Sequence, residues 1–393
     1  MINQLTITIN MKITDIEAFI LESPYENTAP EGSEEARGVK HCFLLKVSTD
    51  EGIVGWSDTE TASHVAEAAV NAPDSGAGWF EGLRTIAIGE DPFHVERLWD
   101  KVYQGSIYYG RRGVAMQMMS AFDIACHDII GKAINKPVHT ILGGARRDRV
   151  RAYASTLFRP TPEAIKEACA YYLERGFTAI KFGFGVFGEN FKRDIALVAA
   201  AREAIGPDVD LMVDPGWFVS RSAQDVIELC RALEPYNIYF LEDFMFPECY
   251  QGYAKVKAAG VKTRLAAGEH EATAWGFRRL IQEGGIDIVQ PDLTRCGGFT
   301  QVRKIIWEAE YAGVDVCPHA WLTDLNTAAS LHTNAILRRS LFLEYNVSDN
   351  PMLREVIENP VKMDKDGYIA IPQGPGLGIN INEEAVRKFC INK

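Results

Sequence analysis

The feature that most constrains the fold is a repeated unit that begins near Val150 and continues to Leu343. Each repeat holds a helix, a glycine that ends it, a short apolar strand and then a polar residue. Short apolar strands that alternate with helices form parallel sheets, and eight of them predict a closed (β/α) barrel. The predicted strands cover residues 150–154, 178–181, 210–213, 238–241, 265–267, 286–290, 314–317 and 341–343.

A polar residue stands at or just after the end of seven of these strands. In chain order they are Lys181, Asp214, Glu242, Glu269, Asp292, His319 and Glu344. One (β/α) unit takes roughly 30 residues, so the spacing assigns one of them to each successive unit. Because the carboxyl ends of barrel strands meet at one mouth, we expect all seven side chains to converge on a single site.

Three carboxylates, Asp214, Glu242 and Glu269, fall on neighbouring strands. They would repel one another unless a cation lies between them, and ligation by oxygen alone favours Mg²⁺ over Zn²⁺. The alternative is three solvated loop acids, which the regular spacing disfavours. The sequence therefore predicts Asp214, Glu242 and Glu269 as ligands of Mg²⁺.

The next two strands end with Asp292 and His319, a carboxylate and an imidazole. Such a pair fixes the tautomer of the imidazole and raises its basicity, as a general base requires. A lone histidine is more often a core residue, but its place in the series favours a catalytic role. Lys181 is predicted to neutralise a substrate carboxylate, with a surface salt bridge as the alternative. Glu344 is predicted to hydrogen-bond the substrate, because a fourth carboxylate ligand would overload the cation.

The first part of the chain has a different texture. Strand-like stretches at residues 11–20 and 41–48 and a turn at residues 50–52 precede a helical stripe between Gly113 and Lys132. Strands followed by helices predict an α+β domain over residues 1–135, before a barrel over residues 136–365. Residues 366–393 have no evident barrel role and are predicted to return to the first domain.

Composition limits the classes of partner. The 393 residues are 47% hydrophobic and 24% charged, which fits a two-domain globular protein, and no apolar run is long enough for a membrane span. A net charge of −12 argues against nucleic acid and anionic membranes. The eight scattered cysteines predict reduced thiols, and residues 1–4 lack the pattern of a secretion signal, so we expect a cytoplasmic protein.

Several short strings resemble the enolase superfamily, mandelate racemase subgroup. They are Val213-Asp214, Leu241-Glu242-Asp243, Ala267-Gly268-Glu269, Gln290-Pro291-Asp292 with Gly297-Gly298, and Pro318-His319-Ala320. Further matches at Ala121–Ala125, Leu142–Gly144 and Pro375–Gly378 extend the resemblance over nearly the whole chain. The ordered set is far more specific than any one string.

The resemblance implies a modified (β/α)8 TIM-type barrel and an α+β N-terminal capping domain completed by the C-terminal segment. It also implies Mg²⁺ on the three carboxylates, His319 with Asp292 as the base, and Glu344 as a hydrogen-bond partner of the substrate carboxylate. Proteins of this family usually self-associate, so a homo-oligomer is expected.

One departure from the family pattern bears on the reaction. The subgroup often has Lys-x-Lys on the second strand, with the second lysine as a base, but here the chain reads Lys181-Phe182-Gly183. A racemase needs a base on each face of the substrate, whereas a dehydratase can work with His319 alone. The predicted function is a Mg²⁺-dependent dehydratase of a sugar acid, an aldonate or an aldarate, that yields a 2-keto-3-deoxy acid.

Three other functions remain open at this point. They are racemisation or epimerisation of a 2-hydroxy acid, a non-catalytic barrel, and dinucleotide binding through the glycine pattern of residues 183–188. The dinucleotide hypothesis leaves Glu242, Glu269 and His319 unexplained.

Substrate contacts are predicted from position alone. Arg111 and its neighbour Arg112 precede the helical stripe, and Tyr25 lies in an early loop that resembles the family's specificity loop. Trp217, His270 and Trp321 flank the predicted site residues. None of them identifies which sugar acid is bound.

Overall fold

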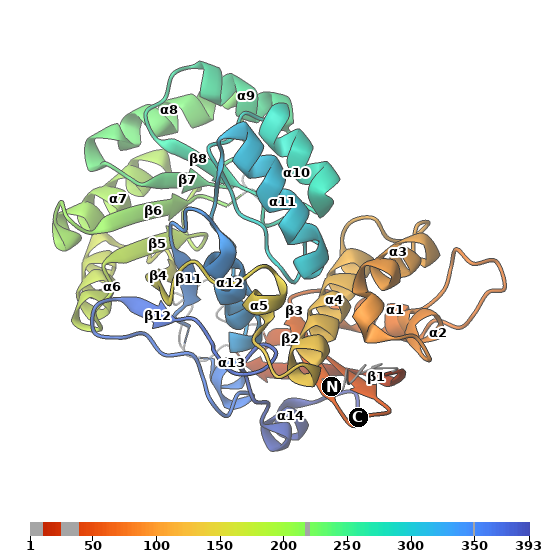
Figure 1. The fold of residues 1–393 in the computed structure, drawn as a ribbon. Helices are drawn as coiled ribbons and strands as arrows, with labels where there is room; N and C mark the ends of the chain where they lie inside the picture. Colours follow the sequence, from red (N-terminus) through yellow and green to blue (C-terminus); the bar gives the residue numbers. More distant parts are fainter. Residues whose placement is uncertain (1–10, 25–38, 217–220, 349) are drawn as a thin grey trace, which may run out of the picture.

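The computed structural model describes residues 11–24, 39–216, 221–348 and 350–393 of the chain. Within them, a small antiparallel sheet with its helices lies beside a larger parallel barrel, as Figure 1 shows. This arrangement confirms the predicted fold class, a TIM-type barrel with an α+β capping domain. None of the described helices is long and apolar enough to cross a membrane.

The capping sheet is a meander with the order β1-β2-β3. Its strands are β1 (Ile13–Pro24), β2 (Val39–Thr49) and β3 (Val54–Thr59). The helices that follow are α1 (Ser63–Asn71), α2 (Leu83–Ala87), the 3-10 turn η2 (Pro92–His94), α3 (Val95–Gly105) and α4 (Val114–Ala133).

The barrel strands pair in parallel in the order β10-β9-β8-β7-β6-β5-β4-β11. They are β4 (Arg149–Leu157), β5 (Ala179–Gly183), β6 (Asp210–Asp214), β7 (Phe240–Glu242), β8 (Arg264–Ala267), β9 (Ile288–Val289), β10 (Asp315–Val316) and β11 (Leu343–Asn346). Helices cover the outside of this sheet (Figure 1): α6 (Pro162–Glu174), α7 (Phe191–Ile205), α8 (Ala223–Leu233) with the 3-10 turn η3 (Glu234–Tyr236), α9 (Tyr250–Ala258), α10 (Thr273–Gln282), α11 (Gly298–Ala312) and α12 (Asp324–Ile336). The short helix α5 (Val138–Ile141) lies between α4 and α12.

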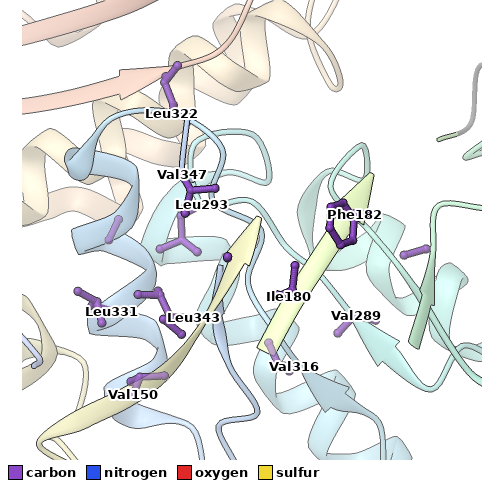
Figure 2. Close-up of a cluster of buried hydrophobic side chains, with 14 of the residues drawn as sticks. Val150, Ile180, Phe182, Val289, Leu293, Val316, Leu322, Leu331, Leu343 and Val347 are labelled. Atoms are coloured by element: carbon purple, nitrogen blue, oxygen red, sulfur yellow. The ribbon is translucent and has the colours of Figure 1, made fainter. Parts of the chain in front are cut away.

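Two apolar layers hold the barrel wall. Inside the barrel, one cluster takes a buried side chain from each of the eight units: Tyr153, Ala179, Met212, Phe240, Ala266, Ile288, Cys317 and Phe342. Outside it, strand residues such as Ile180, Val289 and Leu343 belong to the main core with Leu331 of α12, as Figure 2 shows. Because successive strand residues point to opposite faces, each short strand contributes to both layers.

Helix α4 joins the cap to the barrel, and both of its faces are buried. Gly55 of β3 lets the helix approach closely, because a Cβ there would lie 2.1 Å from the backbone oxygen of Ala125. On the other side, Asp123 accepts a hydrogen bond of 3.1 Å from the backbone N–H of Thr300 in α11. This helix therefore buries more residues than the predicted apolar stripe, including polar ones such as Asp123.

The C-terminal segment differs in part from its prediction. Residues of β12 (Tyr368–Ala370) pair antiparallel with β4, so this stretch extends the barrel sheet and does not lie on the cap. After α13 (Pro351–Glu355) and β12, the chain reaches the cap through α14 (Glu383–Phe389) and a bridge between Leu21 and Cys390. A three-residue strand has too little periodicity to be recognised in the sequence.

Asp128 of α4 connects three parts of the chain. One carboxylate oxygen accepts the backbone N–H of Leu377 at 2.9 Å, and the other accepts that of Trp56 at 3.2 Å and the Lys132 Nζ at 2.6 Å. Only 2% of Asp128 is exposed, so water cannot replace these bonds if the carboxylate is removed.

We expect Asp128→Ala to lower the free energy of unfolding by roughly 2–4 kcal/mol, because two buried backbone donors lose their acceptor. Chemical denaturation would measure the change. Asp100→Ala, which removes an exposed acid of α3, is the matched control and should stay within about 0.5 kcal/mol of the parent. Equal stability of the two variants would show that the hydrogen bonds of Asp128 do not stabilise the fold.

Candidate active site

The seven strand-end residues surround one cavity at the mouth of the barrel. The cavity has a volume of about 300 Å³, and five of the seven line it: Lys181, Asp214, Glu269, His319 and Glu344. The other two, Glu242 and Asp292, contact members of that group directly. All seven are at most 6% exposed. Side chains from seven strands up to 163 residues apart thus form one buried cluster of charge.

The carboxylates of Asp214, Glu242 and Glu269 each place an oxygen within 4.8 Å of the others. Burial and the neighbouring Glu242 raise the pKa of Asp214 well above its usual range. The protein alone thus disfavours the charged form of Asp214, and a cation among the three carboxylates would favour it. A compact set of carboxylate oxygens fits a hard divalent cation such as Mg²⁺.

Lys181 contacts two members of this triad and Glu344. A substrate carboxylate was the partner predicted for it from the sequence. Its Nζ is 2.8 Å from Glu242 Oε1, 2.8 Å from Glu344 Oε1 and 3.8 Å from Asp214 Oδ2. Burial alone would lower the pKa of Lys181, but Glu242 and Glu344 hold it well above its usual range. The lysine is therefore a fixed positive charge that offsets part of the repulsion among the acids.

His319 and Asp292 form a hydrogen-bonded pair, with 2.7 Å between His319 Nδ1 and Asp292 Oδ2. Asp292 also accepts hydrogen bonds of 2.7 Å from both the backbone N–H and the hydroxyl of Thr294. Burial alone would raise the pKa of Asp292, but Arg295 and His319 lower it, so the carboxylate stays ionised. An ionised Asp292 holds the proton on Nδ1 and leaves Nε2 directed to Glu269, 2.9 Å away at the cavity.

Glu344 has few hydrogen-bonding positions left for a ligand. Oε1 accepts from the Ser155 hydroxyl at 2.7 Å and from Lys181, and Oε2 accepts from the backbone N–H of Ala320 at 2.8 Å. Oε2 is also 3.7 Å from His319 Nε2. Glu344 thus connects the lysine to the base dyad, a contact that the prediction of substrate binding did not include.

The predicted substrate contacts fall into three groups. His270 and Trp321 line the cavity. Tyr25 and Trp217 lie outside the described residues. Arg111, in contrast, lines a separate cavity beside α10 and not the cavity of the strand-end residues. The structure therefore does not place it where the predicted substrate contact requires. The reason is its neighbour Arg112, which lies 3.2 Å from the buried Glu271 and holds the loop at the start of α10.

Three charged residues of the cavity were not predicted from the sequence: Lys40, Glu60 and Arg295. Lys40 belongs to β2 and Glu60 follows β3, so both come from the cap. Arg295 stands three residues after Asp292, and that position in a strand-end loop is a signal that could have been used. No local pattern marks Lys40 or Glu60, because their place depends on how the cap docks.

The glycine pattern of residues 183–188 does not form a nucleotide site. It follows a strand of a barrel whose order runs sequentially from β4 to β10, whereas a dinucleotide fold needs an open sheet with a reversal of strand order. Its glycines are explained by packing. A Cβ on Gly183 would lie 3.0 Å from Asp214 Oδ2, and one on Gly185 would lie 2.5 Å from the backbone oxygen of Phe158. The dinucleotide hypothesis is therefore wrong.

A capped (β/α) barrel with three carboxylates and a histidine–aspartate dyad at its mouth defines the class of the enolase superfamily. Within it, the chain belongs to the mandelate racemase / muconate lactonizing enzyme family. Residues 15–143 match the N-terminal domain of that family, and residues 163–385 match the model described as enolase C-terminal domain-like. The resemblance found in the sequence is thereby confirmed.

Three similar proteins are named for activities on sugar acids or their lactones. The chain is 33% identical to the D-galactarolactone cycloisomerase of Agrobacterium fabrum, over 96% of this chain and 99% of the relative. It is also 33% identical to the D-galactonate dehydratase of Cronobacter sakazakii, over 88% and 90% of the two chains. Among solved structures, the 3,6-anhydro-D-galactonate cycloisomerase of Zobellia galactanivorans superposes with a TM-score of 0.85 at 28% identity, covering 97% and 100% of the chains.

We expect Mg²⁺ to raise the thermal midpoint of the metal-stripped protein, because a ligand at about 100 times its dissociation constant stabilises the fold by roughly 2.7 kcal/mol. Asp214→Asn should abolish this gain. Without metal, it should melt no lower than the parent, since it removes a repelling charge from the triad. Glu174→Gln, an exposed acid of α6, should retain the full gain. An undiminished Mg²⁺ effect in Asp214→Asn would refute the assigned ligands.

Proposed function

We propose that this protein is a Mg²⁺-dependent sugar-acid dehydratase that removes the proton at C2, expels the C3 hydroxyl and yields a 2-keto-3-deoxy acid. The observation that carries the proposal is the His319–Asp292 dyad beside the carboxylate triad, in a cavity where Gly183 replaces the family's second lysine. One base suffices for an elimination.

Asp214, Glu242 and Glu269 would hold the cation, which when bound supplies positive charge to stabilise the oxyanion that develops on the substrate carboxylate. His319 Nε2 accepts the C2 proton, and Asp292 keeps the imidazole in the required tautomer. In the protein alone, Glu269 and Glu344 raise the pKa of His319 well above its usual range against the effect of burial. A cation held by Glu269 would oppose this effect and favour the neutral imidazole, the form that accepts a proton. Lys181 partly offsets the charge of Glu344 through their direct contact.

The steps balance without any further reactant. The electron pair of the broken C2–H bond forms a C2–C3 double bond, and the C3–O bond breaks. The departing hydroxide takes up a proton and leaves as water, and the enol tautomerises to the 2-keto acid. His319, once protonated, is a source for that proton at the cavity surface.

A cycloisomerase is the second candidate, because the Agrobacterium relative matches over nearly the full length of both chains. The two activities differ in the mass of the product. An isomerase returns a product of unchanged mass, whereas a dehydratase returns one that has lost a water molecule. Mass spectrometry of the products from a panel of aldonates, aldarates and sugar lactones, incubated with Mg²⁺, separates the two.

Racemisation or epimerisation is less well supported by the cavity. The position of the family's second lysine is Gly183, and the side chain of Asp214 packs directly against it. Gly183 has no side chain that could act as a base. Proton return from the face opposite His319 would then require a different group.

We expect His319→Asn to reduce kcat about 10²–10⁴-fold or more on any sugar acid that the parent dehydrates, because general-base catalysis contributes about that factor. Product is measured with semicarbazide. His64→Asn, an exposed histidine of α1, should keep the parent rate. Full turnover by His319→Asn would remove the proposed base.

The pH dependence of kcat/KM should reveal the dyad. Only neutral His319 accepts a proton, so the rate rises with pH through the pKa of His319. An ionised Asp292 favours the imidazolium, and therefore Asp292→Asn should move this rise to lower pH and reduce the plateau. A pH profile of kcat/KM for parent and variant measures both effects. A rise displaced to higher pH would contradict the proposed role of Asp292.

A further inference from the structure

Besides the seven strand-end residues, the cavity holds a second group of charged side chains: Lys40 and Glu60 from the cap, and Arg295 from the barrel. Glu60 lies between two cations: it pairs with Lys40 of β2, and its Oε2 is 2.9 Å from Arg295 NH2 of the barrel. All three line the same cavity as His319. None of the three takes part in the proposed elimination, so they are open to contact with the part of a substrate beyond the reacting carbons.

The end of β3 is held against the barrel by its own hydrogen bonds. The Thr59 hydroxyl donates to the backbone oxygen of Thr294 at 2.9 Å, and Asp58 accepts from both the backbone N–H and the hydroxyl of Thr323. These contacts fix the backbone of the residues just before Glu60 to two loops of the barrel mouth. Glu60 is therefore a pre-positioned part of the cavity wall.

The exposures of the three side chains determine what they offer to a ligand. Side-chain exposure is 33% for Glu60, but 6% for Lys40 and 12% for Arg295. Arg295 is surrounded by acids, since it also lies 3.5 Å from Glu269 and 3.6 Å from Asp292. Burial alone would raise the pKa of Glu60, but Lys40 and Arg295 lower it. The accessible member of the group is thus an ionised carboxylate, an acceptor of hydrogen bonds.

The positively charged groups of the cavity wall are already engaged. Among the described lining residues, Lys181 contacts Glu242, Arg295 contacts Glu60, His270 contacts Glu269 at 3.0 Å, and Lys40 contacts Glu60. Lys40 and Arg295 carry positive charge, but both are largely buried and paired with acids, whereas Glu60 is the most exposed of the three. A ligand group that reaches this wall therefore meets a carboxylate first, which favours a hydroxyl over a second substrate carboxylate.

We propose that Glu60 is a specificity-determining residue that accepts hydrogen bonds from the distal hydroxyls of the substrate and excludes a second carboxylate. The substrate class is then the monoanionic aldonates, and aldarates of the same configuration are discriminated against. This inference rests on the proposed dehydratase function, which leaves both classes open.

The test compares pairs that differ only at the distal end: D-gluconate with D-glucarate, and D-galactonate with galactarate. We expect kcat/KM of the parent enzyme to be about tenfold or more higher for the aldonate of whichever pair is turned over, since like-charge contacts penalise the dianion. Glu60→Gln should narrow this ratio toward one, because it removes the repelling charge. Glu96→Gln, which removes an exposed acid of α3, should leave the ratio unchanged.

A binding measurement separates this inference from the proposed function. Calorimetric titration of the same pairs into Mg²⁺-loaded His319→Asn protein gives affinities that need no turnover. Tighter binding of the aldonates supports the role of Glu60 even if the parent enzyme dehydrates neither acid, a result that would count only against the dehydratase. Equal or tighter binding of the aldarates, or a ratio unchanged in folded Glu60→Gln, would overturn the inference.

Discussion

The contact between Lys181 and the two glutamates Glu242 and Glu344 is the interaction on which the active site depends. Burying several carboxylates in one cavity is costly unless each has a positively charged partner. Lys181 supplies one such positive charge to Glu242 and Glu344, and Arg295 supplies another to Glu269. Asp214 is the acid of this group whose negative charge is least compensated. Burial and the neighbouring Glu242 raise the pKa of Asp214 well above its usual range. The proposed Mg²⁺ would supply the remaining positive charge.

The cap supplies part of the cavity wall. The barrel builds the triad and the dyad, but Lys40 and Glu60 come from the antiparallel sheet. The cap is held against the barrel by buried polar contacts, among them those of Asp123 with Thr300, Asp58 with Thr323 and Thr59 with Thr294. In the proposed function, the barrel carries the chemistry and the cap takes part in substrate choice, and these hydrogen bonds join the two parts of the chain.

The residues that could be predicted from the sequence are those that recur at a regular spacing. Strand ends recur with the (β/α) unit, so the convergence of Asp214, Glu269 and His319 could be predicted without a structure. The contacts between these side chains were harder to predict. The position of Lys181 was predicted, but its contacts with Glu242 and Glu344 were not, because they depend on the geometry of the barrel. Arg111 was misplaced because a contact of its neighbour with Glu271, 159 residues away, sets the path of the loop. Glu60 was missed since docking between domains leaves no periodic signal.

The most direct test of the central claim follows the C2 hydrogen itself. An aldonate deuterated at C2 is incubated with Mg²⁺-loaded protein, and deuterium release to water is measured together with 2-keto-3-deoxy acid. The account predicts one deuterium released for each product formed, slower turnover than with the undeuterated acid, and loss of both signals when EDTA removes the metal. Product that retains the deuterium, or turnover that persists in EDTA, would contradict metal-assisted proton abstraction at this site.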